Sequence, residues 1–305
     1  MNLDSSFPGD TVTTRAAAAR VLRGVDELRE ALAPARREAG RIGLVPTMGF
    51  LHEGHLSLLR AARAECDLVV MSLFVNPTQF GPGEDFDRYP RDEERDLRLA
   101  AEAGVDLVFA PDAAELYPDG FATEVEVTGP LTSVLDGDPA RRGPGHFRGV
   151  TTIVAKLFNI VGPDVAYFGQ KDAQQAVVIK RMVRDLDFPL RVEVMPTVRE
   201  DDGLAMSSRN GYLEPADRAR AVALSRALAA AEQQAIARDS LQAGLDAARI
   251  ELAAAAIEPE YLEARDAETL EPVEGLTGRP ILVAVAAEVG GARLIDNVVI
   301  EPPVG

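Results

Sequence analysis

Two of the three histidines in the chain, His52 and His55, stand three residues apart and follow an apolar run at 42–46. A helix is predicted after them, through about Arg63. The N-terminus of a helix offers free backbone N–H groups and a partial positive charge, and both favour a phosphate. Because residues three apart share one helix face, both imidazoles can reach the same phosphate chain, where an imidazolium could offset the charge of a departing pyrophosphate. The alternative is a pair of surface histidines at a helix start.

Two amide side chains, Asn76 and Gln79, follow a second apolar run at 67–75. Side-chain amides carry both donors and acceptors, so they suit the hydroxyl and carboxylate groups of a small polar ligand. An ordinary Asn-Pro turn would explain the same residues, and the pattern alone leaves both readings open.

Lys171 is one of only three lysines among 32 basic residues, and it lies in 169–172, directly after an apolar run at 164–168. A cation at the start of a helix opposes the helix dipole, which is unfavourable unless an anion sits there. The position therefore indicates a second phosphate contact. The alternative is an exposed lysine that points to water.

A fourth polar segment, at 200–210, contains Ser207, Ser208 and Arg209 in a loop with Gly203. Hydroxyls and a guanidinium on such a loop could close over phosphates from the opposite side. A polar linker is the alternative.

The elements that must position these segments alternate along the chain. Predicted strands at 42–46, 67–75, 105–110, 164–168 and 190–195 are separated by helical patterns, which predicts an α/β fold with a Rossmann-like parallel sheet and helices on both faces. Ligands bind at the carboxyl ends of such strands, where three of the four segments fall. A short alternating stretch at 124–128 predicts a further edge strand.

The pattern changes after about residue 197. Two alanine-rich helices, from Pro215 and from about Ser240, precede alternating stretches near 261–265, 281–287 and 292–295, which predict a smaller C-terminal α+β domain. We therefore expect a flexible N-terminal extension at 1–22, a nucleotide-binding domain at 23–197 and a lid domain at 198–305.

Composition excludes several classes of protein. The net charge of −17 argues against a nucleic-acid partner, and no window approaches the ~18 apolar residues that a membrane helix needs. A single cysteine, Cys66, rules out a disulfide within the chain and is typical of a reducing compartment, so we expect a cytoplasmic protein.

With these four segments in this order, the chain resembles the pantoate–β-alanine ligase (pantothenate synthetase) family, part of a wider group of nucleotidyl transferases with a His-x-Gly-His signature. The resemblance runs from about Arg23 to Ile300 and includes 145–150 and 293–297. It implies that ATP, with Mg²⁺, activates pantoate as pantoyl adenylate, that β-alanine then displaces AMP to give pantothenate, and that the protein is a homodimer.

The resemblance also implies roles for single residues. His55, His52, Lys171 and Arg209 match the positions with catalytic roles. Substrate-holding positions, for pantoate and β-alanine, correspond to Gln79, Gln175, Asn76 and Tyr89. The residues that match the ATP site are Met48, Gly49, Phe50, Leu51, His52, Glu53, Gly54, His55, Gly169, Gln170, Lys171, Asp172, Val198, Met206, Ser207, Ser208 and Arg209.

The departures from the family are small: Ala173 stands where an aromatic residue is usual, and Gln170 replaces a common Glu. Metal ligands are not assigned, although Asp85 and Asp87 are candidates. Two other functions remain open, a cytidylyltransferase of the same superfamily and a non-catalytic nucleotide-binding module. The two amides at 79 and 175 favour the ligase, because a phosphorylated acceptor would call for more cations.

Overall fold

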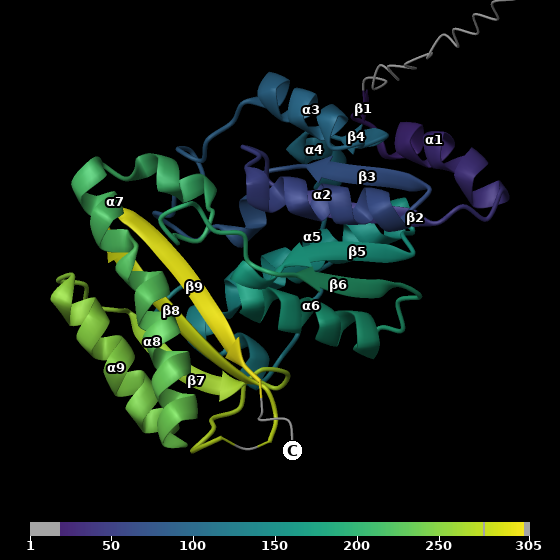
Figure 1. Ribbon diagram of the computed structural model, residues 1–305. Helices are drawn as coiled ribbons and strands as arrows, with labels where there is room; N and C mark the ends of the chain where they lie inside the picture. The colour runs from purple at the N-terminus through teal and green to yellow at the C-terminus, as the bar shows by residue number, and fades with distance from the viewer. Residues whose placement is uncertain (1–18, 277, 302–305) are drawn as a thin grey trace, which may run out of the picture.

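The computed structural model describes residues 19–276 and 278–301, which form two units, each built on its own sheet (Figure 1). In the first unit six parallel strands stand in the order β1-β4-β3-β2-β5-β6. Their bounds are β1 Arg20–Leu22, β2 Ile42–Thr47, β3 Leu68–Leu73, β4 Leu107–Phe109, β5 Val165–Gly169 and β6 Arg191–Met195. The chain runs outward from β2 to β3 and β4, then returns to the other side of β2 with β5 and β6. This reversal places a ligand crevice at the carboxyl ends of β2 and β5.

Helices cover both faces of the parallel sheet, as predicted. On one face lie α1 (Val25–Arg37), α5 (Pro144–Val161) and α6 (Ala173–Asp185), and on the other lie α2 (Glu53–Glu65) and α3 (Glu93–Glu102). A short α4 (Ala113–Leu116) follows β4. The central strands β2, β3, β4 and β5 are mostly buried, which explains why they read as apolar runs, whereas the edge strand β6 is partly exposed and includes Arg191 and Glu193.

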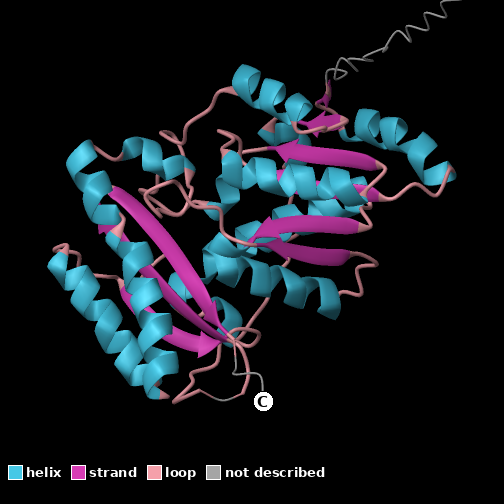
Figure 2. Cartoon of the chain, in the orientation of Figure 1, coloured by secondary structure: helices cyan, strands magenta, loops and turns pink. Residues whose placement is uncertain are grey.

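The second unit is a three-stranded antiparallel sheet of β7 (Tyr261–Asp266), β8 (Ile281–Val289) and β9 (Ala292–Ile300). It is preceded by α7 (Pro215–Ala221), α8 (Ala223–Arg238) and α9 (Leu241–Ala254), and α8 and α9 cover one face of it (Figure 2). Alternate residues of β8 serve two cores. Those at 281, 283 and 285 face the helices, whereas those at 282, 284 and 286 pack with Phe147 and Val178 of the first unit.

The structure corrects the predicted N-terminal extension of 1–22. Its last residues, Arg20–Leu22, form the edge strand β1, because the backbone of this segment pairs with β4 in parallel register. Residues 1–18 lie outside the described part of the chain.

The edge strand predicted at 124–128 is also absent from the described chain. The backbone there bonds to a helix rather than to a strand, since the N–H of Val125 donates to the Thr152 hydroxyl of α5 at 2.9 Å.

Within the described residues, five short 3₁₀ turns complete the connections. They are η1 (Pro77–Gln79), η2 (Pro130–Thr132), η3 (Leu135–Gly137), η4 (Gln170–Asp172) and η5 (Ser208–Tyr212). Among residues 19–276 and 278–301, no helix is long and apolar enough to cross a membrane.

Candidate functional site

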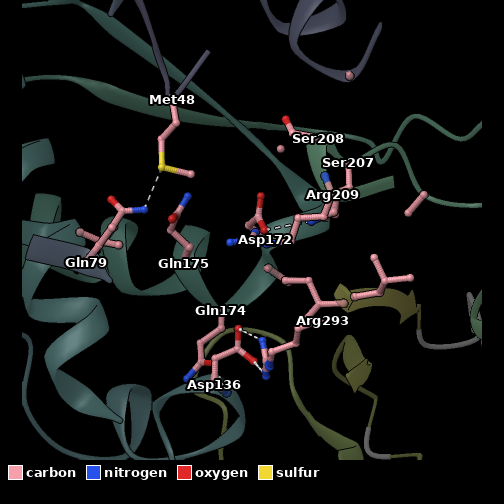
Figure 3. A pocket seen from close by; sticks show the side chains of 18 of the residues that line it. Met48, Gln79, Asp136, Asp172, Gln174, Gln175, Ser207, Ser208, Arg209 and Arg293 are labelled. Atoms are coloured by element: carbon pink, nitrogen blue, oxygen red, sulfur yellow. Dashed lines mark hydrogen bonds and ion pairs between the residues drawn. The ribbon is translucent and has the colours of Figure 1, made fainter. Parts of the chain in front are cut away.

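One cavity of about 480 Å³ opens at the carboxyl ends of the parallel strands, and residues of both units line it. His52 and His55 reach it from the start of α2, Lys171 from the turn after β5, and Arg209 from η5. Figure 3 shows Arg209 and Ser207 on the side of the cavity opposite Gln79. The structure therefore brings the four residues with predicted catalytic roles to a single cavity, although they are far apart in the sequence.

The two histidines fix each other at the start of α2. The backbone N–H of Gly54 donates to Nδ1 of His52 at 3.2 Å, and the backbone N–H of His52 donates to Nδ1 of His55 at 3.3 Å. The ring centroids are 4.1 Å apart. Because each Nδ1 accepts a hydrogen bond, each neutral ring carries its proton on Nε2. Both rings thus present an N–H donor on the side away from the helix backbone.

Burial keeps both imidazoles uncharged at neutral pH. Burial, together with the nearby charge of Lys171, lowers the pKa of His52 to about 4. Burial, and then His52 and Lys171, hold the pKa of His55 well below its ordinary value of 6.5. The sequence suggested that a protonated imidazole meets the phosphates. The lowered pKa values mean instead that His52 and His55 are both neutral at neutral pH and act as N–H donors.

Gly54 is required by a close approach inside the protein. A Cβ at this position would lie 2.9 Å from Cε1 and Nδ1 of the His52 ring. The structure shows that the glycine makes room for the histidine side chain.

The turn that precedes the histidines is held by a carboxylate from α3. Asp96 is 1% exposed, and its two oxygens accept the backbone N–H groups of Phe50 and Leu51, each at 2.7 Å. Gly49 adopts a φ of +84°, and a Cβ there would lie 2.7 Å from Leu73 and 2.9 Å from the Asp96 carboxylate. This turn therefore shapes the site from behind, and its residues 49–51 do not line the cavity.

Lys171 lies in η4, between β5 and α6, and its side chain is 19% exposed. Its Nζ lies 3.3 Å from a carboxylate oxygen of the neighbouring Asp172, and both residues line the cavity. The side chain of Gln170 instead turns to β9, where its Nε2 donates to Oδ1 of Asn297 at 3.0 Å.

Arg209 is engaged by an internal carboxylate. Its Nε and one terminal nitrogen donate to the two oxygens of Asp85 at 2.9 and 2.8 Å, and its guanidinium lies 5.8 Å from the centre of the Tyr89 ring. Both Asp85 and Tyr89 line the cavity. A phosphate that binds Arg209 must therefore share or replace this carboxylate.

The segment before η5 is a hairpin with its own hydrogen bonds. Met206 N–H donates to the carbonyl of Val198 at 3.0 Å, and the Asn210 side chain donates to Glu200 and to the carbonyl of Ala205. Two buried oxygens here, Thr197 Oγ1 and Asn210 Oδ1, have no hydrogen-bond partner among the described residues, and both residues line the cavity. Buried polar atoms of this kind are normally paired, so they are available to a ligand.

The substrate-side amides form a short relay. Tyr117 donates to Oδ1 of Asn76 at 2.8 Å, Asn76 Nδ2 donates to Oε1 of Gln79 at 3.2 Å, and Gln79 Nε2 donates to the sulfur of Met48 at 3.2 Å. Asn76 is 1% exposed. The relay fixes which end of the Gln79 amide faces the cavity.

Gln174 and Gln175 are neighbours with different tasks. Gln174 donates to the carbonyls of Leu131 and Val134, at 2.9 and 2.8 Å, and accepts the backbone N–H of Asp136. Gln175 points into the cavity between Gln79 and Asp172 (Figure 3), and none of the hydrogen bonds found in the described chain involves its side chain. Of these two glutamines, Gln175 has the position expected of a substrate contact.

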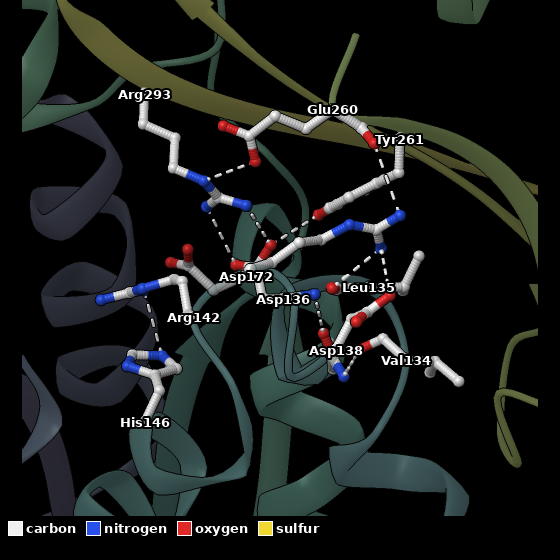
Figure 4. A network of polar contacts seen from close by, with 12 residues as sticks. Val134, Leu135, Asp136, Asp138, Arg142, His146, Asp172, Glu260, Tyr261 and Arg293 are labelled. Atoms are coloured by element: carbon white, nitrogen blue, oxygen red, sulfur yellow. Dashed lines mark hydrogen bonds and ion pairs between the residues drawn. The ribbon is translucent and has the colours of Figure 1, made fainter. Parts of the chain in front are cut away.

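A buried ion pair joins the two units at one wall of the cavity. Asp136 of η3 accepts hydrogen bonds from Arg293 of β9 and from the Tyr261 hydroxyl, both at 2.8 Å, and Arg293 also pairs with Glu260 at 2.9 Å (Figure 4). Burial alone would raise the pKa of Asp136, but Arg293 holds that pKa below its ordinary value. The carboxylate therefore stays charged within the interface.

His146, the third histidine, supports the substrate side from α5. Its Nδ1 lies 2.7 Å from the carbonyl oxygen of Gln79, and its Nε2 lies 3.2 Å from Arg142, which pairs with Glu84 at 2.6 Å. Burial, and then the charge of Arg142, lower the pKa of His146 to about 4. A neutral ring with its proton on Nδ1 satisfies both contacts.

Most of the residues assigned from sequence line the cavity. These are Met48, His52, Gly54, His55, Asn76, Gln79, Tyr89, Gly169, Lys171, Asp172, Gln175, Val198, Met206, Ser207, Ser208 and Arg209. Five assigned residues are not in the lining: Gly49, Phe50, Leu51, Glu53 and Gln170. Glu53 pairs with Arg60 on the outer side of α2.

Sequence reasoning gave no role to several lining residues: Asp136, Arg142, His146, Gln174, Thr197, Asn210, Arg293 and Asn297. Three of these, His146, Arg293 and Asn297, lie within the family-like stretches 145–150 and 293–297, so a signal was present for them. Asp136 stands in a loop without any pattern that would single it out.

The side chains of residues 19–276 and 278–301 do not form a metal site by themselves. In the described part of the chain, no group of three or more His, Cys, Asp or Glu residues is arranged to hold a metal ion. Asp85, one of the two candidates, is occupied by Arg209, and Asp87 is exposed. A Mg²⁺ ion here would take most of its ligands from phosphates and water, as is usual for this ion.

The comparisons with known proteins agree on one family. The family model described as pantoate-beta-alanine ligase matches residues 20–299. A pantothenate synthetase from Moorella thermoacetica is 58% identical over 292 residues, covering 92% of this chain and 98% of that protein. One from Acetivibrio thermocellus is 54% identical over 288 residues, covering 92% and 99%.

Solved structures give the same result. A pantothenate synthetase from Thermus thermophilus superposes with a TM-score of 0.87 at 51% identity, covering 93% of this chain and 100% of that one. A pantoate-beta-alanine ligase from Francisella tularensis, solved in complex with beta-gamma ATP and beta-alanine, has a TM-score of 0.76 at 32% identity, covering 92% and 97%. Sequence and fold thus lead to one conclusion: the chain belongs to the pantoate-beta-alanine ligase family.

Proposed function

We propose that this cavity condenses pantoate with β-alanine at the expense of ATP, through a pantoyl adenylate. The family membership makes the chain a pantothenate-forming ligase. The observation that carries the assignment to this cavity is the convergence of His52, His55, Lys171 and Arg209 with the amides of Gln79 and Gln175. The Francisella relative, solved with beta-gamma ATP and beta-alanine, supports the choice of ATP and β-alanine as ligands.

In the first step, a carboxylate oxygen of pantoate attacks the α-phosphorus of ATP. The bond from that phosphorus to the bridging oxygen breaks, and pyrophosphate leaves. The Nε2–H groups of His52 and His55 and the ammonium of Lys171 donate to phosphate oxygens as charge moves onto the leaving group. Arg209 joins them when its guanidinium exchanges Asp85 for phosphate.

In the second step, the amine of β-alanine attacks the activated carbonyl. The bond between this carbon and the adenylate oxygen breaks, AMP leaves, and the nitrogen loses a proton. Gln79 and Gln175 hold the pantoate portion in both steps, with Asn76 and Tyr89 behind them. Hydrogen bonds from buried amides to substrate hydroxyls can reject an analogue that lacks the hydroxyl by about 10⁴-fold.

We assign the ATP site to the lining residues of 48–55, 169–172, 198 and 206–209. Of the five residues outside the lining, Gly49, Phe50 and Leu51 form the turn before α2, which Asp96 holds through residues 50 and 51. Gln170 lies in η4, and Glu53 pairs with Arg60 on the outer side of α2. Mg²⁺, when bound, would be held mainly by the phosphates of ATP.

Three further expectations stay predictions. The division between 23–197 and 198–305 is supported by β6, which ends at Met195, and by the separate antiparallel sheet. The homodimer follows from the family resemblance alone. The cytoplasmic location rests on the single cysteine, Cys66, which is buried.

The test is exchange of labelled pyrophosphate into ATP, which reports the first step alone. We expect exchange that requires pantoate and does not require β-alanine. Exchange with CTP, or exchange that ignores pantoate, would identify a different nucleotidyl transferase. Binding of ATP without any exchange would favour the non-catalytic module and overturn the proposal.

A further inference from the structure

A side chain of the second unit holds the loop that carries Lys171. Asn297 of β9 is 5% exposed, and its Nδ2 donates to the carbonyl oxygens of Gln170 and Lys171, both at 2.9 Å. Its Oδ1 accepts from Nε2 of Gln170 at 3.0 Å. Both N–H donors and the oxygen of this amide are thus used on two consecutive residues of one loop.

The loop needs such support from outside. η4 is a single 3₁₀ turn of three residues between β5 and α6, and it has no side-chain cap. The Lys171 ammonium has one ion-pair partner among the described residues, the adjacent Asp172 at 3.3 Å. The direction of its long side chain therefore depends on the backbone at residues 170 and 171, which Asn297 fixes.

The residue before Asn297, Asp296, links β9 to the hairpin that precedes η5. Asp296 is 3% exposed, and its carboxylate pairs with Arg199 at 2.6 and 3.2 Å. It also accepts the backbone N–H of Asn297 at 2.8 Å. Arg199 donates to the carbonyl of Gly203, within the hairpin that leads to Ser207 and Arg209. Adjacent residues of β9 thus contact both segments that carry the proposed phosphate-binding residues, the turn with Lys171 and the hairpin that leads to Arg209.

We propose that Asn297 is a positioning residue that sets Lys171 for adenylate formation, so that the ATP site is complete only when β9 is docked on the β5–α6 turn. The inference rests on the proposed function of the cavity. The second unit would then contribute to the first chemical step through Asn297, which supports Lys171 and does not itself contact ATP.

The experiment compares two half-reactions in Asn297→Asp and Asn297→Ser. The aspartate keeps the shape of the side chain but turns a carboxylate toward two carbonyl oxygens, whereas serine removes most of the contacts. We expect the turnover of pantoate-dependent pyrophosphate exchange to fall about 10- to 100-fold, the size of effect that a misplaced group produces. The KM for pantoate and the reaction of β-alanine with preformed pantoyl adenylate should change less than about twofold.

Two controls separate positioning from general damage. Arg141→Met weakens the junction between the units elsewhere, since Arg141 pairs with Glu263 at 3.2 Å and does not line the cavity. Asn159→Asp adds the same charge as Asn297→Asp on the exposed face of α5. Both should keep exchange within about twofold of the parent enzyme, whatever their melting temperature.

A double-mutant cycle with Lys171→Ala decides whether Asn297 acts through the lysine. If it does, Asn297→Asp costs little further exchange once Lys171 is gone, because residues that act as a unit are not additive. Equal losses with and without Lys171, or full exchange in both Asn297 variants, would overturn the inference while leaving the function of the parent enzyme intact. Absence of exchange in the parent enzyme would instead overturn the proposed function and the inference with it.

Discussion

At the scale of single residues, the protein keeps its histidines neutral by burying them. All three carry lowered pKa values, and two of them accept backbone N–H groups on Nδ1. A neutral donor binds phosphate less strongly than a cation would in the resting site, but it gains strength as negative charge develops on the leaving group. Among the residues proposed to bind the phosphates of ATP, Lys171 and Arg209 supply the permanent positive charge.

Buried neutral histidines make stability depend on pH. In the unfolded chain they bind protons below about pH 6.5, whereas His146 in the folded chain stays neutral down to about pH 4. The unfolded state therefore binds more protons in this window, and the free energy of unfolding falls as the pH drops from about 6.5 to about 4, by about 1–3 kcal/mol for a fully buried histidine.

Urea denaturation across this pH range checks the effect. The variant His146→Asn keeps a donor near the Nδ1 position, toward the carbonyl of Gln79, but cannot titrate. It should show a shallower loss of stability than the parent protein, and identical slopes for the two proteins would contradict the burial argument.

Sequence reasoning found the residues whose chemistry is unusual for their position, such as Lys171 in a chain almost free of lysine. It did not reveal their partners inside the protein. Asp85 and Arg209 are separated by 124 residues, and nothing in either segment indicates that they pair. Asp136 was missed for the same reason, because its role depends on Arg293 and Tyr261 from another unit.

At the scale of elements, a glycine with low helix propensity at the start of α2 leaves room for the imidazole ring of His52. Gly54 lies in the first turn of α2, where alanine would ordinarily favour the helix by up to about 1 kcal/mol. Gly54→Ala should therefore keep or raise the melting temperature, while the methyl group displaces His52 and lowers pyrophosphate exchange by about 10-fold or more.

The matched control for this substitution is Gly145→Ala. Gly145 also lies in the first turn of a helix, α5, and a Cβ there would meet nothing within 4 Å. This variant should retain full exchange. If Gly54→Ala also retained full exchange, the close approach of Gly54 to the His52 ring would not matter for activity.

The elements themselves were largely predictable, because strands buried on both faces give mostly apolar runs, as β2 and β3 do. Short segments at the edge of the sheet were harder to predict. β1 has only three residues, and its pairing with β4 is not visible in its own composition. The stretch at 124–128 alternates as a strand does, yet the hydroxyl of Thr152 on α5 takes the backbone bond that a neighbouring strand would need.

At the scale of the whole molecule, the two units are joined by charged groups as well as by apolar packing. Arg293→Met would leave Asp136, which is 7% exposed, as an unpaired buried carboxylate, and we expect a loss of about 3–5 kcal/mol in the free energy of unfolding. The double variant Asp136→Asn/Arg293→Met removes both charges and should lose less than the sum of the single variants. Chemical denaturation of the four proteins measures this, and additive losses would contradict the pairing.

The position of β8 between two cores has a consequence for how this chain can evolve. A strand with one wet face accepts polar replacements at every second residue, but Ile281 to Ala287 are all buried, with alternate side chains committed to different neighbours. A larger or smaller residue at an odd position strains the helices behind the sheet, while the same change at an even position shifts the seam against Phe147 and Val178. Sequence change along β8 is therefore restricted by two different cores. A substitution in this strand can be compensated only by a second substitution in the core that the changed side chain faces.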